Sequence, residues 1–426
     1  MRREKTFRVF TFGCKVNQYE SQIIREQLVN SGFRESTDDP FICVINSCAV
    51  TAVAERKCRA FIRSVLRKYP NSRVVLAGCY AQLIKREKIR FPGRLISVPQ
   101  DKKQSLIEEL KLSGLIPEDS VKEKNWQAGG IRAFSGHARA FVKIQDGCDN
   151  FCAYCIVPHL RGRPLSKPAE VIKEEIMRLS EKGFREIVLT GINLGSWGRD
   201  LKGGHRLPFL LKKLCLLKGL GRLRLSSLEP EFVDNELIAL IRDEQKICPH
   251  LHVPLQNGDD FVLKMMNRRY TAADYLRLVK NARNSIKDLA MSTDIIVGFP
   301  GEEDKHFQNT LSLVREAGFL RVHIFPYSAR TGTPAAKFRG QVAAEVKKQR
   351  KHILEETVRK SGFAFRRRFL GRELRVLYEE RKSGFWQGYA DNYIFVKAKS
   401  DKDIAGRFIA SRLTGVSEKE TIAEIL

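Results

Sequence analysis

Short apolar runs alternate with amphipathic stretches through the first part of the chain. The runs at residues 7–12, 41–46 and 74–77 are each followed by a turn and then by a helical pattern. One helix is expected over residues 51–68, because Pro70 cannot continue it. Strands that alternate with helices in this way predict an α/β domain with a parallel sheet, which we assign to residues 1–127.

A second alternation follows a stretch, residues 113–136, that loses periodicity and collects Gly, Pro, Ser and charged residues, as linkers do. Six strand-like runs then alternate with amphipathic helices, at residues 141–144, 186–190, 222–226, 250–255, 292–297 and 321–326. Six βα units predict a partial (β/α)6 barrel over residues 128–365. Its chemistry is expected at the carboxyl ends of the strands.

The last part of the chain has a different pattern. Residues 337–368 read as a helix with eleven basic and three acidic residues, which suits phosphate binding or a solvated face equally well. Short alternating runs at 373–378, 393–398 and 409–414 predict a small antiparallel β barrel over residues 366–426. Four aromatic residues there fit either stacking on RNA bases or a hydrophobic core: Phe385, Trp386, Tyr389 and Tyr393.

Composition narrows the class of protein. The 426 residues include 76 Lys and Arg against 49 Asp and Glu, a net charge of +27 that favours a polyanionic partner such as nucleic acid. No run of about 18 apolar residues occurs, so we expect neither export nor a membrane span, and a cytoplasmic location. In that reducing compartment the ten cysteines are expected to act as metal ligands or catalysts rather than disulfides.

Cys148, Cys152 and Cys155 lie in the string DGCDNFCAYC, directly after the first strand of the predicted barrel. Three thiolates at this spacing can hold three irons of a 4Fe-4S cluster and leave the fourth iron open. A structural zinc site normally has four ligands, which this segment does not provide. An open iron at a barrel mouth can bind the amino and carboxylate groups of S-adenosylmethionine (SAM) and deliver an electron to its sulfonium.

Cys14, Cys48 and Cys79 are far apart in sequence, but each closes a strand of the predicted N-terminal sheet. The carboxyl ends of neighbouring parallel strands lie along one edge, so these three side chains are expected to converge and hold a second cluster. The alternative is that they are small buried hydrophobic residues, as cysteine often is. That alternative fits Cys43, in the middle of a strand, better.

A radical site beside a second open cluster predicts the conversion of a C–H bond into a C–S bond, since no side-chain base removes an unactivated proton at a useful rate.

Over nearly its whole length the chain resembles the radical SAM methylthiotransferases. The resemblance rests on the strings GCKVNQYES, NSCAVTAVAERKCR, QDGCDNFCAYCIVPHLRGR, LTGINLGSWGRDL, LSSLEP, VPLQNGDDFVLKMMNRRYT, TDIIVGFPGE and HIFPYSARTGTPAAKF. GCKVNQYES and FPYSARTGTPAA are most similar to the branch that modifies N6-threonylcarbamoyladenosine in tRNA.

The resemblance implies an N-terminal methylthiotransferase domain, a radical SAM barrel and a C-terminal TRAM domain for RNA binding. It also implies that Cys148, Cys152 and Cys155 hold the SAM cluster and Cys14, Cys48 and Cys79 the auxiliary one. A methylthio group would then be placed on adenine C2 at position 37 of tRNA, in the anticodon stem-loop. The electron donor would be a protein of flavodoxin or ferredoxin type, and the sulfur donor stays unassigned.

Four further residues are candidates for contacts with SAM or substrate. Tyr154 lies in the cysteine loop, where the superfamily usually places an aromatic residue near the SAM adenine, and Asn193, Glu229 and Gln256 follow barrel strands. Tyr154 could instead be a core residue, and the other three could cap helices or tie loops.

Three other functions compete with this assignment. Two share the chemistry but act on N6-isopentenyladenosine in tRNA or on an aspartate of a ribosomal protein. The third is a non-catalytic iron-sulfur RNA-binding sensor, which would need the clusters but no SAM site.

Overall fold

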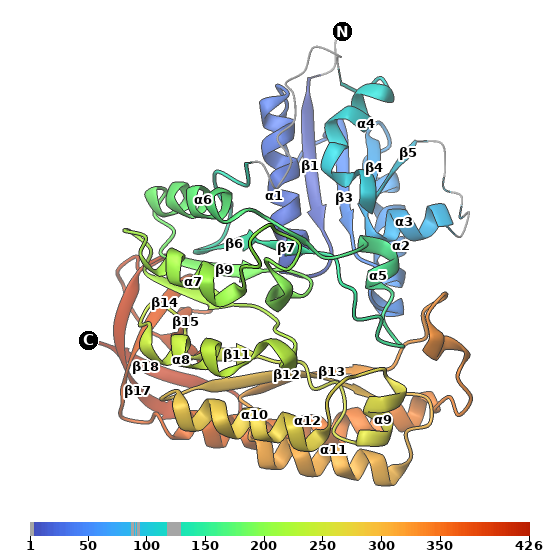
Figure 1. Cartoon of the computed structure of the whole chain (residues 1–426). Helices are drawn as coiled ribbons and strands as arrows, with labels where there is room; N and C mark the ends of the chain where they lie inside the picture. The colour runs from blue at the N-terminus through green and yellow to red at the C-terminus, as the bar shows by residue number, and fades with distance from the viewer. Residues whose placement is uncertain (1–3, 87–88, 90, 92–93, 117–128) are drawn as a thin grey trace.

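The computed structural model describes residues 4–86, 89, 91, 94–116 and 129–426 (Figure 1). No helix in these ranges is long and apolar enough to cross a membrane. Half of the predicted linker at 113–136, residues 117–128, lies outside the described residues. The predicted domain boundary after residue 127 falls in that half.

The N-terminal part is a parallel sheet of strand order β2-β1-β3-β4-β5 with helices on both faces. Adjacent residues of β3 and β4 enter opposite cores. Cys43, Ile45 and Leu76 join the core that packs against α2 and α3, whereas Val44 and Val75 join the core beneath α1 and α4. The elements are β1 (Thr6–Thr11), α1 (Lys15–Asn30), β2 (Arg34–Glu35), β3 (Ile42–Ser47), α2 (Ala52–Lys68), β4 (Arg73–Gly78), α3 (Cys79–Arg86), β5 (Leu95–Pro99), η1 (Gln100–Ser105) and α4 (Leu106–Leu112).

The predicted strands and the predicted helix of this part are confirmed to within a few residues. Thr51 caps α2, because its hydroxyl accepts a hydrogen bond from the Ala54 amide. The α/β class with a parallel N-terminal sheet is therefore correct.

The central part contains six parallel strands in sequential order. They form two three-stranded sheets, β6-β9-β10 and β11-β12-β13, linked by isolated bridges such as Ser227–His252. This is the strand order of the predicted partial barrel. Its elements are β6 (Arg139–Lys143), β7 (Gln145–Asp146), α5 (Val157–Arg161), β8 (Leu165–Ser166), α6 (Ala169–Glu181), β9 (Glu186–Thr190), η2 (Leu194–Ser196), α7 (Leu207–Cys215), β10 (Arg222–Leu225), η3 (Pro230–Phe232), α8 (Asn235–Asp243), β11 (His250–His252), α9 (Asp260–Met265), α10 (Ala272–Ser285), β12 (Ala290–Val297), α11 (Asp304–Ala317), β13 (Arg321–Pro326), η4 (Pro334–Lys337) and α12 (Ala344–Arg367).

Two elements of this part are shorter than the sequence pattern indicated. Strand β11 ends at His252 rather than at Leu255, because Pro254 has no amide hydrogen for the ladder. Helix α12 begins at Ala344 rather than at Lys337, since Gly340 has a φ of 73° that no helix contains.

The C-terminal part is a closed barrel of order β14-β15-β16-β18-β17, antiparallel except where β16 pairs with β18. Its core includes Phe365 and Phe369 at the end of α12 and Ala290 of β12, so it is docked on the central part. The strands are β14 (Glu373–Lys382), β15 (Phe385–Ala390), β16 (Phe395–Ala398), β17 (Phe408–Val416) and β18 (Thr421–Ile425).

The aromatic residues of this barrel do not form an open row for stacking on RNA. Trp386 belongs to the core. Tyr389 and Tyr393 stack on each other with 4.7 Å between ring centroids, and the Arg139 guanidinium of the central part lies 4.7 Å from the Tyr389 centroid. Phe385 is half-buried beneath Lys399. The prediction of a core position is therefore confirmed for Trp386. Tyr389 and Tyr393 instead contact Arg139 of the central part.

A buried ion cluster joins the central strands to this barrel. The Glu186 carboxylate accepts hydrogen bonds from Arg222 and Arg224. The two guanidinium groups also donate to backbone carbonyls of the C-terminal barrel, at Tyr389, Ala390 and Asp391. All three charged side chains are fully buried.

Glu186→Gln should lower the free energy of unfolding at neutral pH by about 3–5 kcal/mol, because it leaves buried arginines without their counter-charge. Burial alone would raise the pKa of Glu186, but Arg224, Arg222 and Arg139 outweigh it and hold the pKa below its ordinary value. A lowered carboxyl pKa contributes stability above the unfolded value of about 4.3, which is lost as pH falls. Urea unfolding should therefore show the wild-type advantage shrinking at acidic pH.

The matched control is Glu236→Gln, which removes an exposed carboxylate that pairs with Lys212 and should change stability by about 0.5 kcal/mol or less. An advantage of Glu186 that is independent of pH would contradict the ionic origin of this effect.

Candidate active site between two cysteine trios

The structure gathers Cys148, Cys152 and Cys155 in the loop between β7 and α5. The loop is closed by hydrogen bonds from the Cys148 amide to the Gly162 carbonyl (3.1 Å) and from the Cys155 amide to the Cys152 carbonyl (2.9 Å). Burial raises the pKa of Cys155 to about 12 and that of Cys148 to about 11, and neighbouring thiols of the same trio add to both shifts. The three thiols therefore lie close enough to influence one another electrostatically.

Cys14, Cys48 and Cys79 also converge, at the carboxyl edge of the N-terminal sheet. Cys14 precedes α1, Cys48 follows β3 directly and Cys79 is the first residue of α3. Burial, with smaller contributions from Cys79 and Cys14, raises the pKa of Cys48 to about 11. Gly13, with a φ of 110°, permits the close approach, since a Cβ there would lie 2.9 Å from the Cys48 Cβ.

The donor sets suit a polynuclear cluster better than a single ion. Within the described part of the chain, neither trio brings its three sulfur atoms within 4.8 Å of one another, as a mononuclear site would require. A cube of four irons separates its ligands more widely, and three thiolates leave one of its irons open. The remaining cysteines, Cys43, Cys58, Cys215 and Cys248, are buried, as expected for core residues.

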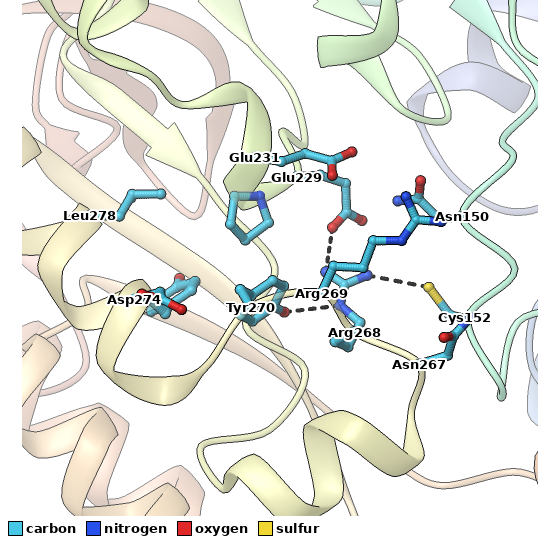
Figure 2. A pocket seen from close by; sticks show the side chains of 12 residues that line it. Asn150, Cys152, Glu229, Glu231, Asn267, Arg268, Arg269, Tyr270, Asp274 and Leu278 are labelled. Atoms are coloured by element: carbon cyan, nitrogen blue, oxygen red, sulfur yellow. Dashed lines mark hydrogen bonds and ion pairs between the residues drawn. The ribbon is translucent and has the colours of Figure 1, made fainter.

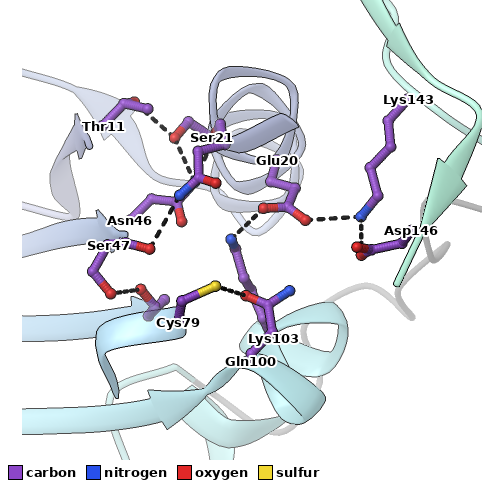
Figure 3. Close-up of polar contacts among 12 residues, drawn as sticks. Thr11, Glu20, Ser21, Asn46, Ser47, Cys79, Gln100, Lys103, Lys143 and Asp146 are labelled. Atoms are coloured by element: carbon purple, nitrogen blue, oxygen red, sulfur yellow. Dashed lines mark hydrogen bonds and ion pairs between the residues drawn. The ribbon is translucent and has the colours of Figure 1, made fainter. Parts of the chain in front are cut away.

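A network of buried charges lies near Cys79 and links α1 to β6 (Figure 3). The Glu20 carboxylate on α1 accepts hydrogen bonds from Lys103 of η1, from Lys143 of β6 (2.8 Å) and from Arg161 of α5 (3.0 Å). Asp146 accepts from Lys143 and Arg161 as well. Burial would raise the pKa of Glu20, but the three cations outweigh it and hold the pKa well below its ordinary range.

Arg161 connects this network to the sulfur atoms. It follows the loop of the Cys148 trio on α5, and its guanidinium interacts electrostatically with Cys79 and Cys48 of the other trio. One side chain therefore contributes positive charge near two thiols that would have to be thiolates to bind iron.

A cavity of about 310 Å³ opens beside Cys152 (Figure 2). Arg268 crosses it, with one guanidinium nitrogen 3.3 Å from the Cys152 sulfur and another bonded to Glu229. Its third nitrogen donates to the Tyr270 hydroxyl (3.0 Å). A carboxylate, a guanidinium and a thiol are thus presented together at the mouth of the central strands.

Of the four other candidates from the sequence, only Glu229 lines this cavity. Asn193 is buried, and neither polar atom of its side chain has a partner in the described structure. Tyr154 is half-buried and packs against the apolar cluster that contains Val262 and Phe299. Gln256 is half-buried with a φ of 66°, and its backbone pairs with β12.

Comparison with known proteins agrees with this geometry. The profile of the Radical SAM superfamily matches residues 142–314, and that of the uncharacterised protein family UPF0004 matches residues 6–95. The chain is 39% identical over 425 residues to the threonylcarbamoyladenosine tRNA methylthiotransferase MtaB of Thermotoga maritima, covering 98% of this chain and 96% of that protein. It is 36% identical to the MtaB of Chlamydia pneumoniae, covering 99% and 98%.

The chain belongs to the radical SAM tRNA methylthiotransferases. A relative from Acetivibrio thermocellus, named tRNA-2-methylthio-N(6)-dimethylallyladenosine synthase, is 32% identical and covers 97% of this chain and 89% of that protein. Among solved structures, the radical SAM methyltransferase TsrM of Kitasatospora setae gives a TM-score of 0.54 at 14% identity, covering 78% of this chain and 75% of that one, which shows likeness of fold.

Sequence reasoning about this methylthiotransferase missed two arginines, Arg161 and Arg268. Arg268 follows α9 in the string MNRRYT, and this basic pair near the end of a βα unit was a usable signal. Arg161 had no such signal, because its partner Glu20 is 141 residues away.

Glu20→Gln should loosen the contact between α1 and the central part, because it removes a charge shared by three buried cations. Hydrogen exchange followed by mass spectrometry should become at least about a hundredfold faster in both α1 and α5. Glu35→Gln, which removes an exposed partner of Arg25, is the control and should leave both segments unchanged. Faster exchange confined to α1 would show that the network does not join the two parts.

Proposed function

We propose that this protein places a methylthio group on adenine C2 of N6-threonylcarbamoyladenosine at position 37 of tRNA. The observation that carries the proposal is the similarity, at 33–39% identity over nearly the whole chain, to three relatives named for this activity. The convergence of two separate cysteine trios agrees with it, since sulfur insertion needs both a radical source and a sulfur carrier.

In this proposal Cys148, Cys152 and Cys155 hold a 4Fe-4S cluster that binds SAM, and Cys14, Cys48 and Cys79 hold the auxiliary 4Fe-4S cluster. When bound, the clusters and SAM supply the radical chemistry and the sulfur transfer. The described residues position these groups. Arg268 orients the Cys152 sulfur and Glu229, so that the Glu229 carboxylate faces the cavity where it can accept hydrogen bonds from the SAM amino group or ribose.

The other proposed SAM or substrate contacts have different support. The Asn193 amide is buried without a partner, which a bound ligand would satisfy. Tyr154 lies in the cysteine loop between two ligands, where its ring can pack against the SAM adenine. Gln256 is proposed from its position after β11 and is not among the residues that line the cavity beside Cys152.

The proposed macromolecular partner is the anticodon stem-loop of tRNA. The net charge of +27 and the basic helix α12 suit a phosphate backbone. We also propose a cytoplasmic location and a reducing donor of flavodoxin or ferredoxin type, since cluster chemistry with SAM requires an electron.

One second candidate has an observation in its favour. Relatives named for 2-methylthio-N(6)-dimethylallyladenosine synthesis are 32% and 34% identical over nearly the whole chain. Mass spectrometry of tRNA nucleosides from a deletion strain separates the two. Loss of the methylthio derivative of threonylcarbamoyladenosine supports the proposal, and its persistence overturns it.

Cys148→Ala and Cys14→Ala should each lower the iron content of anaerobically purified protein from about eight to about four atoms per chain, because each removes one ligand of a different cluster. Only Cys148→Ala should also abolish formation of 5'-deoxyadenosine from SAM and dithionite. The control Cys215→Ala removes a buried thiol outside both trios and should keep the iron. Equal iron in Cys14→Ala and wild type would refute the second cluster.

Asn193→Ala should weaken SAM binding about tenfold without lowering the thermal midpoint, because the side-chain amide makes no hydrogen bond with any described residue. Equilibrium dialysis with the reconstituted protein gives the affinity, and calorimetry gives the midpoint. Asn281→Ala, which removes an exposed amide on α10, is the control. A lower midpoint with unchanged SAM affinity would assign Asn193 a structural role.

A further inference from the structure

Strands β11, β12 and β13 have one face that does not pack against helices. On β12, Ile295 and Val297 enter the helix-covered core, whereas Ser292 and Asp294 point the other way, toward histidines of neighbouring strands. Two residues further on, Ile296 joins the apolar cluster beside the loop of the Cys148 trio. We call this side of β11–β13, which carries Ser292, Asp294 and Ile296, the inner face. One end of it lies beside the cysteine loop.

Three polar side chains meet on the inner face. His252, Asp294 and His323, one from each strand, bring a nitrogen or oxygen atom within 4.8 Å of one another. The His252 ring is held by its Nδ1, 2.9 Å from the Ser292 hydroxyl, and its Nε2 lies 3.2 Å from the Asp294 carboxylate. His323 stays exposed, with its ring centroid 5.6 Å from that of His252.

Two cations border this group, whose one carboxylate, Asp294, lies 3.2 Å from the His252 ring. Lys15 and Arg321 are half-buried, and neither makes an ion pair or a side-chain hydrogen bond within the described part of the chain. They lie 5.9 and 5.8 Å from the centroid of the Tyr393 ring, and both interact electrostatically with His323. Tyr393 and, more weakly, Glu186 raise the pKa of Lys15, and Glu186 is already bonded to Arg222 and Arg224.

Unpaired cations in a partly buried site favour an anionic ligand, because desolvation without a counter-charge is costly. The same cations disfavour a divalent metal ion on the histidines. The site also lies between the trios: Lys15 directly follows Cys14, and the inner face ends at the Cys148 loop. A base that reacts with groups held at both trios has to lie in this region.

The two tRNA substrates for which the relatives are named differ in the charge of the N6 substituent. The threonylcarbamoyl group carries a carboxylate, a hydroxyl and an N–H, whereas the dimethylallyl group is apolar. Phe325 is the next residue of β13 on the same face as His323, roughly 6–7 Å further along, and its side chain is 41% exposed. An adenine stacked on Phe325 can direct its N6 substituent toward His323 and the cations.

We propose that Lys15, Arg321 and His323 bind the carboxylate of the threonylcarbamoyl group, with Asp294 accepting from its N–H or hydroxyl and Phe325 supporting the adenine. This specificity site rests on the proposed function. A backbone phosphate of the tRNA is the other anion with the same chemistry, so the test separates the two.

The test measures binding of three anticodon stem-loop RNAs to anaerobically reconstituted protein by fluorescence anisotropy. The RNAs carry threonylcarbamoyladenosine, its uncharged carboxamide or dimethylallyladenosine at the same position. Wild type should bind the carboxylate RNA about tenfold to a hundredfold more tightly than the carboxamide RNA. Lys15→Met and Arg321→Met should each reduce this preference to about threefold or less, mainly by lowering the affinity for the carboxylate RNA.

Lys218→Met is the matched control, since it removes an exposed lysine after α7 and should keep the wild-type preference. Lys15→Arg should retain most of the preference, and iron content should be unchanged in Arg321→Met, which lies outside both trios. If Lys15→Met and Arg321→Met lower the affinity for all three RNAs equally, the cations contact a phosphate and the proposal is overturned. The proposal is also overturned if wild type binds the carboxylate and carboxamide RNAs with equal affinity. Methylthiolation of the dimethylallyl RNA alone would instead overturn the proposed function.

Discussion

The active-site arrangement depends on one buried carboxylate. Glu20 on α1 receives hydrogen bonds from η1 of the N-terminal part and from β6 and α5 of the central part. Each cysteine trio is attached to an element of this network, since Cys14 directly precedes α1 and Cys155 lies just before α5. A buried ion cluster of this kind adds little net stability compared with apolar packing, but a displaced partner is costly. Its main effect is therefore on geometry, because it holds the two trios in one relative position.

A second buried carboxylate acts similarly at the other end of the central strands. Glu186 begins β9, and its arginine partners donate to the backbone of the C-terminal barrel. The barrel is thus joined to the amino ends of β9 and β10, on the left in Figure 1, while the N-terminal sheet lies above the central part. The inner face of β11–β13 lies between these two junctions. The two junctions therefore fix the N-terminal sheet and the C-terminal barrel relative to this inner face.

The chain itself carried enough information to predict the strand order and the cysteine trios, but not the networks that join them. Cys14, Cys48 and Cys79 were predictable because strands β1, β3 and β4 are parallel neighbours, so their carboxyl ends meet whatever the surrounding contacts are. Arg161 and Glu20 show no local pattern, and their pairing follows only from the packing of α1 against the central part. The contacts of Tyr389 and Tyr393 could not be predicted for the same reason, because they depend on packing between distant parts of the chain. Their spacing suited RNA stacking, yet docking of the barrel places them against Arg139.

Substrate choice has to arise from a small number of side chains. Relatives named for a charged N6 substituent and relatives named for an apolar one both match this chain over almost its full length. The shared fold and clusters therefore cannot discriminate between them, and neither can contacts to the RNA backbone, which both substrates offer. Lys15 and Arg321 are half-buried, and neither forms an ion pair with another described residue. In the proposed specificity site, an apolar substituent would leave these cations without a counter-charge, whereas a carboxylate would supply one.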